Sequence, residues 1–280
     1  MGPVRRLARK LESVRRYPRL ASGAADSASL WLLGLHRNRV PGSGIAAGIL
    51  LGVGRVIAPR LAPARGQRIR VDLGQAAQID VFDELLLEGI YDLAAVTFGP
   101  SLVVDCGAFC GYFSAMASGF FPGAHIACSE ANPANIGTLE AQLALLDRKV
   151  EMTAAAVHLQ DGFADFAGEG MGGALVGAGA APGSLRVPSV DFPRWLRERA
   201  PKSMVWKLEV EGAEADLLAP TLPRLPRRTA CFLETHHPDR RCDELLGPYR
   251  DAGFEIHEVR RRTAPAGGFD YVEWLLVRSG

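Results

Sequence analysis

The sequence has few cysteines, and no two of them form a C-x-x-C pair. There are five in 280 residues, Cys106, Cys110, Cys128, Cys231 and Cys242. Three of these five lie in apolar, strand-like runs or beside a glycine turn. This usage excludes a disulfide framework and differs from zinc-ligand spacing. We therefore predict small buried cysteines, a reducing compartment and a cytoplasmic location.

An excess of charge of either sign is also missing. The chain has 32 Lys and Arg against 31 Asp and Glu, a formal net charge of +1. Nucleic-acid-binding proteins usually carry a strong basic surplus, so we expect no nucleic-acid partner. The clearest basic cluster lies in Val4 to Val14, where the apolar spacing predicts an amphipathic helix. Such a helix can lie on an anionic membrane surface, and a solvated helix is the alternative.

No apolar run is long enough to cross a membrane. Ile45 to Ile57 covers about 13 residues, short of the ~20 that a spanning helix needs, so we predict a buried helix there. No apolar segment follows the basic start, as a secretory signal would require. Pro59 to Gly66 predicts a linker. We therefore expect an N-terminal helical extension and linker at residues 1–66 and one main domain at residues 67–280.

A buried strand, a glycine turn and a helix start follow one another between Leu102 and Ser114. The run Leu102 to Val104 is typical of a parallel strand covered on both faces. Gly107 and Gly111 allow the backbone to turn sharply and to approach a ligand. A helix from about Tyr112 would point its free N–H groups back at the same place. This arrangement binds nucleoside-containing cofactors at the carboxyl end of a strand.

The spacing within the turn distinguishes between two cofactors. The pattern is Asp105-x-Gly107-x-x-x-Gly111, whereas a dinucleotide fingerprint is G-x-G-x-x-G with glycine directly after the strand. The carboxylate of Asp105 would repel a pyrophosphate, but it can accept hydrogen bonds from a cationic, amino-acid-like group. The spacing therefore favours S-adenosylmethionine (SAM) over NAD. A strand–turn–helix corner without a ligand is the alternative.

From Gln67 onward, strand-like runs alternate with helix-like segments, which predicts a parallel α/β sheet. The last two predicted strands have no helix between them, so we expect them to pair antiparallel. The glycine- and alanine-rich residues 168–184 predict a surface loop. The predicted strands are Arg68–Leu73, Ala77–Val81, Leu102–Val104, His125–Ser129, Val150–Val157, Ser203–Glu209, Thr229–Glu234, Phe254–Val259 and Tyr271–Val277, and Phe82–Glu88 is a predicted helix.

A carboxylate and a helix start follow the second strand of this alternation. Glu130 lies about 20 residues beyond the glycine turn, where a carboxylate can accept both hydroxyls of a ribose. Asn132 could assist it. The other role of Asn132 is to cap the helix that begins at Pro133.

Charges recur at every second position near the end of the fourth strand. If the strand extends that far, Lys207, Glu209 and Glu211 share one face at its carboxyl end. Glu234 and His236 share a face at the end of the fifth strand. Charges in central strands are costly unless they are paired or used, and these strand ends border the ligand crevice of α/β sheets. We predict a catalytic cluster, with an internal Lys207–Glu209 ion pair needed only for folding as the alternative.

Five short stretches carry motifs that occur together in one enzyme family: Val103–Ser114, Glu130–Pro133, Ser189–Asp191, Lys207–Glu214 and Glu234–His236. With them, the chain from about Arg68 to its end resembles the FkbM-type SAM-dependent methyltransferases. The most specific of the five is Lys-x-acid-x-Glu-Gly-Ala-Glu. The first 60 or so residues lie outside the resemblance.

The resemblance implies a Rossmann-like class I methyltransferase fold, with a mostly parallel seven-stranded sheet and an antiparallel C-terminal strand. It implies methyl transfer to an oxygen, often the hydroxyl of a sugar, glycan or small natural product. The chain departs from the family at Phe109, where asparagine is usual, and at Glu209, where aspartate is usual. The implied SAM-binding residues are Asp105, Gly107, Ala108, Gly111, Tyr112, Glu130 and Asn132.

In such a transfer the protein mainly positions the reactants and supplies a base for the acceptor hydroxyl. We predict that Glu209 or His236 is the base and that Lys207 and Glu211 orient it, with Glu234 in the same cluster. The carboxylates of Glu209, Glu211 and Glu234 could hold magnesium or manganese, but we do not expect a metal ion.

Two other functions stay open. An NAD-dependent oxidoreductase is disfavoured by Asp105 before the first glycine and by the missing G-x-G-x-x-G. A non-catalytic protein that binds SAM or a partner through the same pocket is favoured by Phe109. Nucleic-acid methylation is disfavoured because the chain has no Asn-Pro-Pro-Tyr motif and no Pro-Cys nucleophile.

Overall fold

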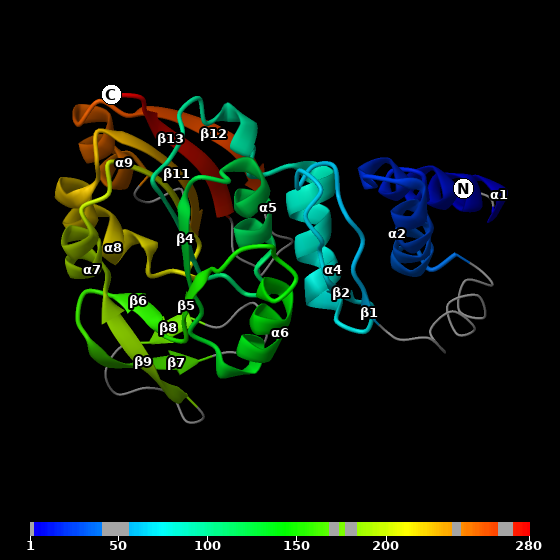
Figure 1. Ribbon diagram of the computed structural model, residues 1–280, viewed down its shortest axis with the longest axis horizontal. Helices are drawn as coiled ribbons and strands as arrows, with labels where there is room; N and C mark the ends of the chain where they lie inside the picture. The colour runs from blue at the N-terminus through cyan, green and yellow to red at the C-terminus, as the bar shows by residue number, and fades with distance from the viewer. Residues whose placement is uncertain (1–2, 41–55, 168–173, 177–183, 237–241, 263–270) are drawn as a thin grey trace.

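A computed structural model describes residues 3–40, 56–167, 174–176, 184–236, 242–262 and 271–280. Its centre is a seven-stranded sheet of order β12-β13-β11-β10-β3-β4-β5 (Figure 1). Among these strands β13 alone runs in the direction opposite to the other six. The strands are β3 (Leu102–Cys106), β4 (His125–Ser129), β5 (Glu151–Thr153), β10 (Ser203–Leu208), β11 (Arg228–His236), β12 (Glu255–Arg262) and β13 (Tyr271–Arg278).

The strand order confirms the predicted fold class. From β5 to β11 the sheet follows the doubly wound order 3-2-1-4-5, and β13 is inserted between β11 and β12. This is the Rossmann-like class I methyltransferase sheet with its antiparallel C-terminal strand. The carboxyl ends of β3, β4 and β10 therefore lie together at one edge, where such sheets bind ligands.

Helices cover both faces of the sheet because alternate residues of its strands are apolar on both sides. Val103 and Val205 belong to a core that includes residues of α5, whereas Val104 and Trp206 belong to a core shared with α7, α8 and α9. Figure 1 shows these two helical layers. The helices are α5 (Tyr112–Phe120), α6 (Pro133–Leu143), α7 (Phe192–Arg199), α8 (Glu214–Thr221), which continues into the short η5 (Leu222–Arg224), and α9 (Cys242–Asp251).

The segment before β3 is helical where we predicted a strand at Ala77–Val81. α4 (Ala76–Phe82) continues into the π-helical turn η3 (Asp83–Glu88), followed by η4 (Leu93–Ala95). Ile79, Phe82 and Leu86 are buried at helical spacing. The strand predicted at Arg68–Leu73 shortens to β2 (Val71–Asp72), which pairs with β1 (Val56–Ile57). Most of the helix predicted at Ile45–Ile57 lies outside the described residues.

The N-terminal elements pack on α4 and η3. α1 (Pro3–Val14) confirms the predicted basic helix, and η1 (Tyr17–Leu20) and α2 (Ala24–Arg37) follow it. The ring of Tyr17 stacks on that of Phe82, and its hydroxyl donates to Asp83 Oδ1 at 2.8 Å. Arg37 pairs with both Asp80 and Asp83. In Figure 1 α1 and α2 project from the α4 side of the main fold.

A second, four-stranded sheet of order β6-β9-β7-β8 lies below the carboxyl edge of the main sheet (Figure 1). It consists of β6 (Ala156–His158), β7 (Gly162–Ala167), β8 (Ala174–Val176) and β9 (Leu185–Asp191). We had predicted a surface loop over residues 168–184. Within that range β8 is a strand, and residues 168–173 and 177–183 lie outside the described part.

The cysteines follow the prediction where their side chains are described. Cys106, Cys110, Cys128 and Cys231 are free and buried. Burial raises the pKa of the Cys106 thiol to about 12, which keeps it protonated near neutral pH. Within the described ranges, no helix has the length and apolar character that crossing a membrane demands.

Candidate active site

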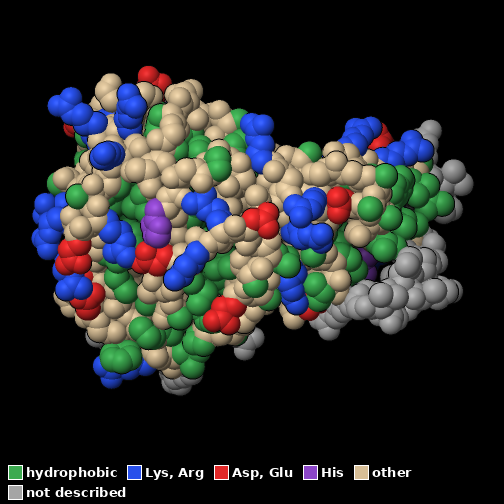
Figure 2. Space-filling model, viewed as in Figure 1, with side chains coloured by type: hydrophobic (Ala, Val, Ile, Leu, Met, Phe, Trp, Pro, Cys, Tyr) green, Lys and Arg blue, Asp and Glu red, His purple; other side chains and the backbone are tan. Residues whose placement is uncertain are grey.

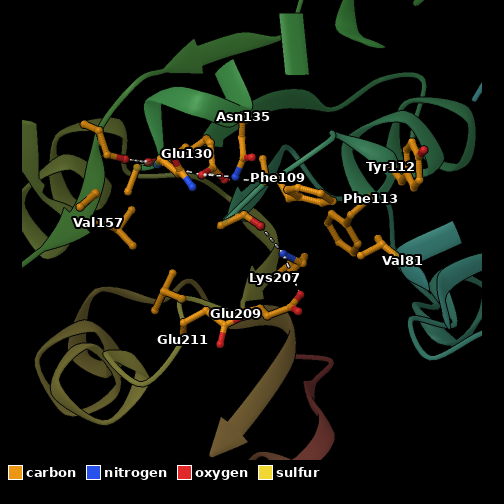
Figure 3. A pocket seen from close by; sticks show the side chains of 18 of the residues that line it. Val81, Phe109, Tyr112, Phe113, Glu130, Asn135, Val157, Lys207, Glu209 and Glu211 are labelled. Atoms are coloured by element: carbon orange, nitrogen blue, oxygen red, sulfur yellow. Dashed lines mark hydrogen bonds and ion pairs between the residues drawn. The ribbon is translucent and has the colours of Figure 1, made fainter. Parts of the chain in front are cut away.

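A pocket opens where the turn after β3 and the loops after β4 and β10 meet (Figure 3). It has a volume of about 890 Å³ when the space at its open mouth is included. α4 and η3 border one side, and the second sheet borders another. The described lining residues are Val81, Glu84, Leu85, Gly107, Ala108, Phe109, Tyr112, Phe113, Ser129, Glu130, Ala131, Asn132, Asn135, Ala155, Ala156, Val157, Phe166, Lys207, Glu209, Val210 and Glu211.

Most of the predicted site residues meet in this one pocket. Those that line it come from three separate strand ends, as the parallel sheet requires. They are Gly107, Ala108, Tyr112, Glu130, Asn132, Lys207, Glu209 and Glu211. Asp105, Gly111 and Glu234 do not line it, and the side chain of His236 lies outside the described residues.

The turn after β3 needs its glycines for different reasons. Gly107 and Gly111 both have φ +77°, in the left-handed region. A Cβ on Gly107 would lie 1.8 Å from the backbone oxygen of Glu209, so no larger residue fits there. A Cβ on Gly111 would lie 2.8 Å from Leu139 Cδ1. Phe109 is also left-handed, at φ 46°, a conformation that asparagine tolerates better than an aromatic residue.

Asp105 supports the turn from behind. Its side chain is 0% exposed. One carboxylate oxygen, Oδ2, accepts from Ser114 N at 3.2 Å and from Ser114 Oγ at 2.8 Å, at the start of α5. The other, Oδ1, lies 3.3 Å from Lys207 Nζ. A direct contact between this carboxylate and a cationic ligand group stays a prediction, and the described contacts of Asp105 are with Ser114 and Lys207.

Glu130 is oriented at the pocket wall by three donors. Its Oε2 accepts from Phe109 N at 2.8 Å, and its Oε1 accepts from Asn132 N at 2.8 Å and Asn135 Nδ2 at 3.1 Å. A carboxylate offers about four acceptor sites, so Glu130 retains capacity for one further donor, such as a hydroxyl group in the pocket. Asn132 also caps α6 by accepting from Ala134 N at 3.0 Å, the alternative role predicted for it.

Lys207 joins the turn after β3 to the loop after β10. Its ammonium donates to the Gly107 carbonyl at 2.7 Å and lies 3.3 Å from Asp105 Oδ1 and 3.1 Å from Glu209 Oε2. Burial lowers the pKa of this lysine, but the charges of Glu209 and Asp105 outweigh burial and raise the pKa above its ordinary value. Lys207 is therefore a charged group that bridges two carboxylates.

Tyr91 is a site residue that the sequence did not reveal. Its hydroxyl donates to Glu209 Oε2 at 2.8 Å, so the same oxygen receives both Tyr91 and Lys207. Burial, and then the charge of Glu209, raises the pKa of Tyr91 well above its ordinary value, so the phenol stays a donor. The ring packs edge-on against Phe113 and Phe232. Tyr91 belongs to no amphipathic pattern, and no sequence signal marks it.

The loop after β10 begins one residue earlier than predicted, because β10 ends at Leu208. Glu209 and Glu211 thus reach the pocket from a loop and not from one face of a strand. Glu211 adopts φ 58°. Glu214, at the start of α8, fixes this loop by accepting from Val210 N at 2.8 Å and Gly212 N at 2.9 Å. These two bonds give the Glu-Gly-Ala-Glu sequence its structural role.

Glu234 lies apart from the pocket. It is buried on β11, in register with Glu273 of β13. The three carboxylates considered for a metal ion are thus not brought together around one point. Across the residues that the structure describes, no group of three or more His, Cys, Asp or Glu side chains is arranged to hold a metal ion.

Two further parts of the pocket wall come from segments whose role was not predicted. Val81, Glu84 and Leu85 enter from α4 and η3, and Phe166 enters from β7 of the second sheet. Val81 lies in the predicted strand Ala77–Val81, Glu84 and Leu85 lie in the predicted helix Phe82–Glu88, and no element is predicted at Phe166. The apolar character of Val81, Leu85 and Phe166 indicates burial only.

Comparisons with known proteins give a likeness of structure only. No family model and no curated protein matches the sequence. Precorrin-6y C5,15-methyltransferase from Geobacter metallireducens is 16% identical with a TM-score of 0.42, over 69% of this chain and 87% of its own. Methyltransferase FkbM from Methylobacillus flagellatus is 13% identical with a TM-score of 0.43, over 96% of this chain and 59% of its own. TYW2 of M. jannaschii, solved in complex with AdoMet, is 13% identical with a TM-score of 0.43, over 79% of this chain and 85% of its own. At these values no family is established for this chain.

Proposed function

We propose that the protein is a SAM-dependent methyltransferase that methylates a hydroxyl group on a sugar, glycan or small natural product, as its resemblance to the FkbM-type enzymes implies. The observation that carries the proposal is the pocket itself. It brings the carboxylate of Glu130 and the Lys207–Glu209 pair to one cavity at the carboxyl edge of a Rossmann-like sheet, on either side of the Gly107 turn (Figure 3). Each feature has a separate use in such a reaction.

The residues present fit SAM on two counts. Glu130 accepts three hydrogen bonds within the protein and has capacity left for one hydroxyl of a ribose. Ala155, Val157 and Phe166 form an apolar wall near Glu130 that suits the flat face of a purine. When bound, the cosubstrate would supply a methyl group carried on a positively charged sulfur.

The chain's own contribution to the chemistry centres on Glu209. Its carboxylate would take the proton of the acceptor hydroxyl, so that the acceptor oxygen can form its new bond to carbon. Tyr91 and Lys207 both bind Oε2 of Glu209, which fixes the orientation of that carboxylate. A positioned base of this kind typically contributes ~10²–10⁴-fold to the rate. Asp105 positions Lys207 in turn, because it lies on the other side of the ammonium.

Calorimetric titration of the full chain with S-adenosylhomocysteine, SAM and NAD tests the proposal. We expect S-adenosylhomocysteine and SAM to bind and NAD not to bind. Glu130→Ala should weaken S-adenosylhomocysteine binding by about tenfold or more, since hydrogen bonds to a charged acceptor are worth about 1.5–3 kcal/mol. Binding of NAD alone would replace the proposal with an oxidoreductase. Turnover of SAM with candidate sugars and glycans then tests methyl transfer.

A second candidate, a non-catalytic protein that binds SAM or a partner through this pocket, is favoured by one observation. Phe109 lines the cofactor turn at φ 46°, where the related family has asparagine. Phe109→Asn would suit that backbone conformation and remove a ring from the pocket. If the bulk of Phe109 limits cofactor binding, the variant should bind S-adenosylhomocysteine more tightly than the parent. Unchanged affinity would remove the reason for this candidate.

A further inference from the structure

The pocket has a marked excess of carboxylates on its lining. Among the described residues that line it, Glu84, Glu130, Glu209 and Glu211 are acidic, and Lys207 is the one cation. With Glu130 assigned to the cosubstrate, the other three carboxylates belong to the rest of the lining. From this lining we infer that the methyl acceptor carries a protonated amine near its reacting hydroxyl, as amino sugars and amino alcohols do. The inference rests on the proposed function and specifies its substrate class.

The single lining cation does not offset this charge. Lys207 is already held between Asp105 and Glu209, at 3.3 and 3.1 Å, and it also donates to the Gly107 carbonyl. Two ion pairs and the hydrogen bonds to the carbonyls of Cys106 and Gly107 therefore already engage this ammonium within the protein. An anionic acceptor group could reach Lys207 only by displacing one of them.

Glu84 is brought to the pocket by an unusual backbone. It lies in η3, a π-helical turn, and such turns occur frequently at functional sites. Its Oε1 lies 3.1 Å from Arg262 Nη1 and 3.6 Å from Arg260 Nη2, which fix the carboxylate from outside. Neither arginine lines the pocket. Glu84 therefore presents a fixed negative charge beside the apolar side chains of Val81 and Leu85.

The two arginines are themselves shared among more carboxylates than they can neutralise. Arg260 pairs with Glu273 and Glu88 as well as Glu84, and Arg262 pairs with Glu88 at 2.7 Å. Two cations thus serve three carboxylates in this cluster. The negative charge of Glu84 is only partly compensated within the protein, and a cationic group in the pocket would complete the compensation.

The titration properties of the same residues agree with this geometry. Burial raises the pKa of Glu84 and of Glu273, although the arginines oppose the rise, and the charge of Glu209 adds to it in both cases. Glu84 and Glu209 therefore act on each other across this end of the pocket. A site of like charges favours an ammonium and repels a phosphate or carboxylate on the acceptor.

Ligand-observed NMR with the full chain tests the inference. The probes are matched sets of one hydroxylated scaffold bearing an amine, no charge or a phosphate, for example glucosamine, glucose and glucose 6-phosphate, extended to amino alcohols and other hexoses. They are presented with and without S-adenosylhomocysteine. We expect the binders to be amine-bearing compounds and their binding to weaken as salt is raised.

Two variants and a control separate specific recognition from general charge. Glu84→Gln and Glu211→Gln should each weaken the amine-bearing binders by about tenfold, which is the effect of losing one hydrogen-bonded charge partner. Glu140→Gln, an exposed position on α6 outside the pocket, should leave them unchanged. Glu211→Gln keeps the test valid if Glu84→Gln disturbs the ion pairs that Glu84 makes with Arg260 and Arg262.

Outcomes against the inference are distinct from outcomes against the proposed function. Binders that are anionic, binders without charge preference, or no amine-bearing binder at all would overturn the inference while S-adenosylhomocysteine binding stands. Failure of S-adenosylhomocysteine to bind would overturn the proposed function. An amine preference of the chain without nucleoside would then still support an ammonium site in this pocket.

Discussion

The backbone oxygen of Glu209 lies against Gly107, at a point that a Cβ on residue 107 would approach to 1.8 Å. Glu209 N also donates to the Cys106 carbonyl at 3.3 Å. The turn after β3 and the loop after β10 are therefore in direct backbone contact. Because one carries the proposed cofactor contacts and the other the proposed base, a change at residue 107 affects both halves of the site.

Gly107→Ala should consequently damage both the fold near the pocket and ligand binding. The new methyl group cannot fit beside the Glu209 carbonyl, and alanine is also strained at φ +77°. We expect a lower melting temperature and weaker S-adenosylhomocysteine binding, by about tenfold or more, in calorimetry. The matched control is Gly137→Ala in α6, where no atom lies within 4 Å of the added Cβ. That change should stabilise by about 0.5–1 kcal/mol.

Lys207 and Glu209 should differ sharply in their tolerance to loss of charge. Lys207→Met would leave Asp105, which is 0% exposed, without its cation, and breaking a buried pair in this way typically costs ~3–5 kcal/mol. The side chain of Glu209 is 29% exposed, and Lys207 would keep Asp105 and the Gly107 carbonyl. Glu209→Gln should therefore melt within a few degrees of the parent, bind S-adenosylhomocysteine, and lose methyl transfer by ~10²-fold or more.

Equal destabilisation by both substitutions would show that the Lys207–Glu209 pair serves folding alone. Parental turnover in Glu209→Gln, once an acceptor is found, would remove Glu209 as the base. His236 would then be the next candidate from the sequence. Thermal denaturation and turnover, measured on the same preparations, distinguish these results.

Much of this site could be predicted because its residues follow strands with strong patterns. The apolar run before Asp105 and the glycines after it identify β3 and its turn, and the position of Glu130 follows from the next strand. Lys207 and Glu209 were found through alternating charges, although β10 ends before Glu209. In each case a short local pattern determined the backbone, and the parallel sheet brought the strand ends together.

The missed residues depend on contacts between distant segments. Tyr91 meets Glu209 only because the segment before η4 packs on α5 and β11, where the Tyr91 ring contacts Phe113 and Phe232. The predicted strand Ala77–Val81 is wrong because this segment is the helix α4, although Ile79 and Val81 alternate with Asp80 as in a strand. The buried side chains of this segment recur at helical spacing only when Phe82 and the residues of the π-helical turn η3 are counted with those of α4.

The basic helix α1 leads to a prediction about membranes. Leu7 and Leu11 are 40% and 38% exposed on successive turns, and Figure 2 shows hydrophobic side chains beside Lys and Arg over α1 and α2. Vesicles containing phosphatidylglycerol should bind the chain, and phosphatidylcholine vesicles should not. The double substitution Leu7→Ser and Leu11→Ser should reduce co-sedimentation by about tenfold or more, since burying each leucine is worth about 1.5–3 kcal/mol.

Leu159→Ser is the control for this prediction, because Leu159 is 36% exposed and lies in the main fold between β6 and β7. It should leave vesicle binding as in the parent. A solvated α1 without membrane contact would give no binding to either kind of vesicle.

The half-buried carboxylate Glu84 predicts how stability changes with pH. Burial raises the pKa of Glu84 above its ordinary value of 4.5, in spite of Arg260 and Arg262. The folded chain therefore holds this proton more tightly than the unfolded chain does. Between pH 4.5 and the raised pKa, linkage makes the free energy of unfolding fall as pH rises. Above that pKa, the stability that came from the more tightly held proton is lost completely.

Glu84→Gln removes this titrating group. Urea denaturation from pH 4.5 to 7 should therefore show a smaller loss of stability in the variant than in the parent. Glu140→Gln should keep the parental dependence, and identical slopes in the parent and Glu84→Gln would mean that water reaches Glu84 freely in the folded chain. Only the slope matters for this comparison, because losing the contacts with Arg260 and Arg262 lowers the stability of Glu84→Gln by its own amount at every pH.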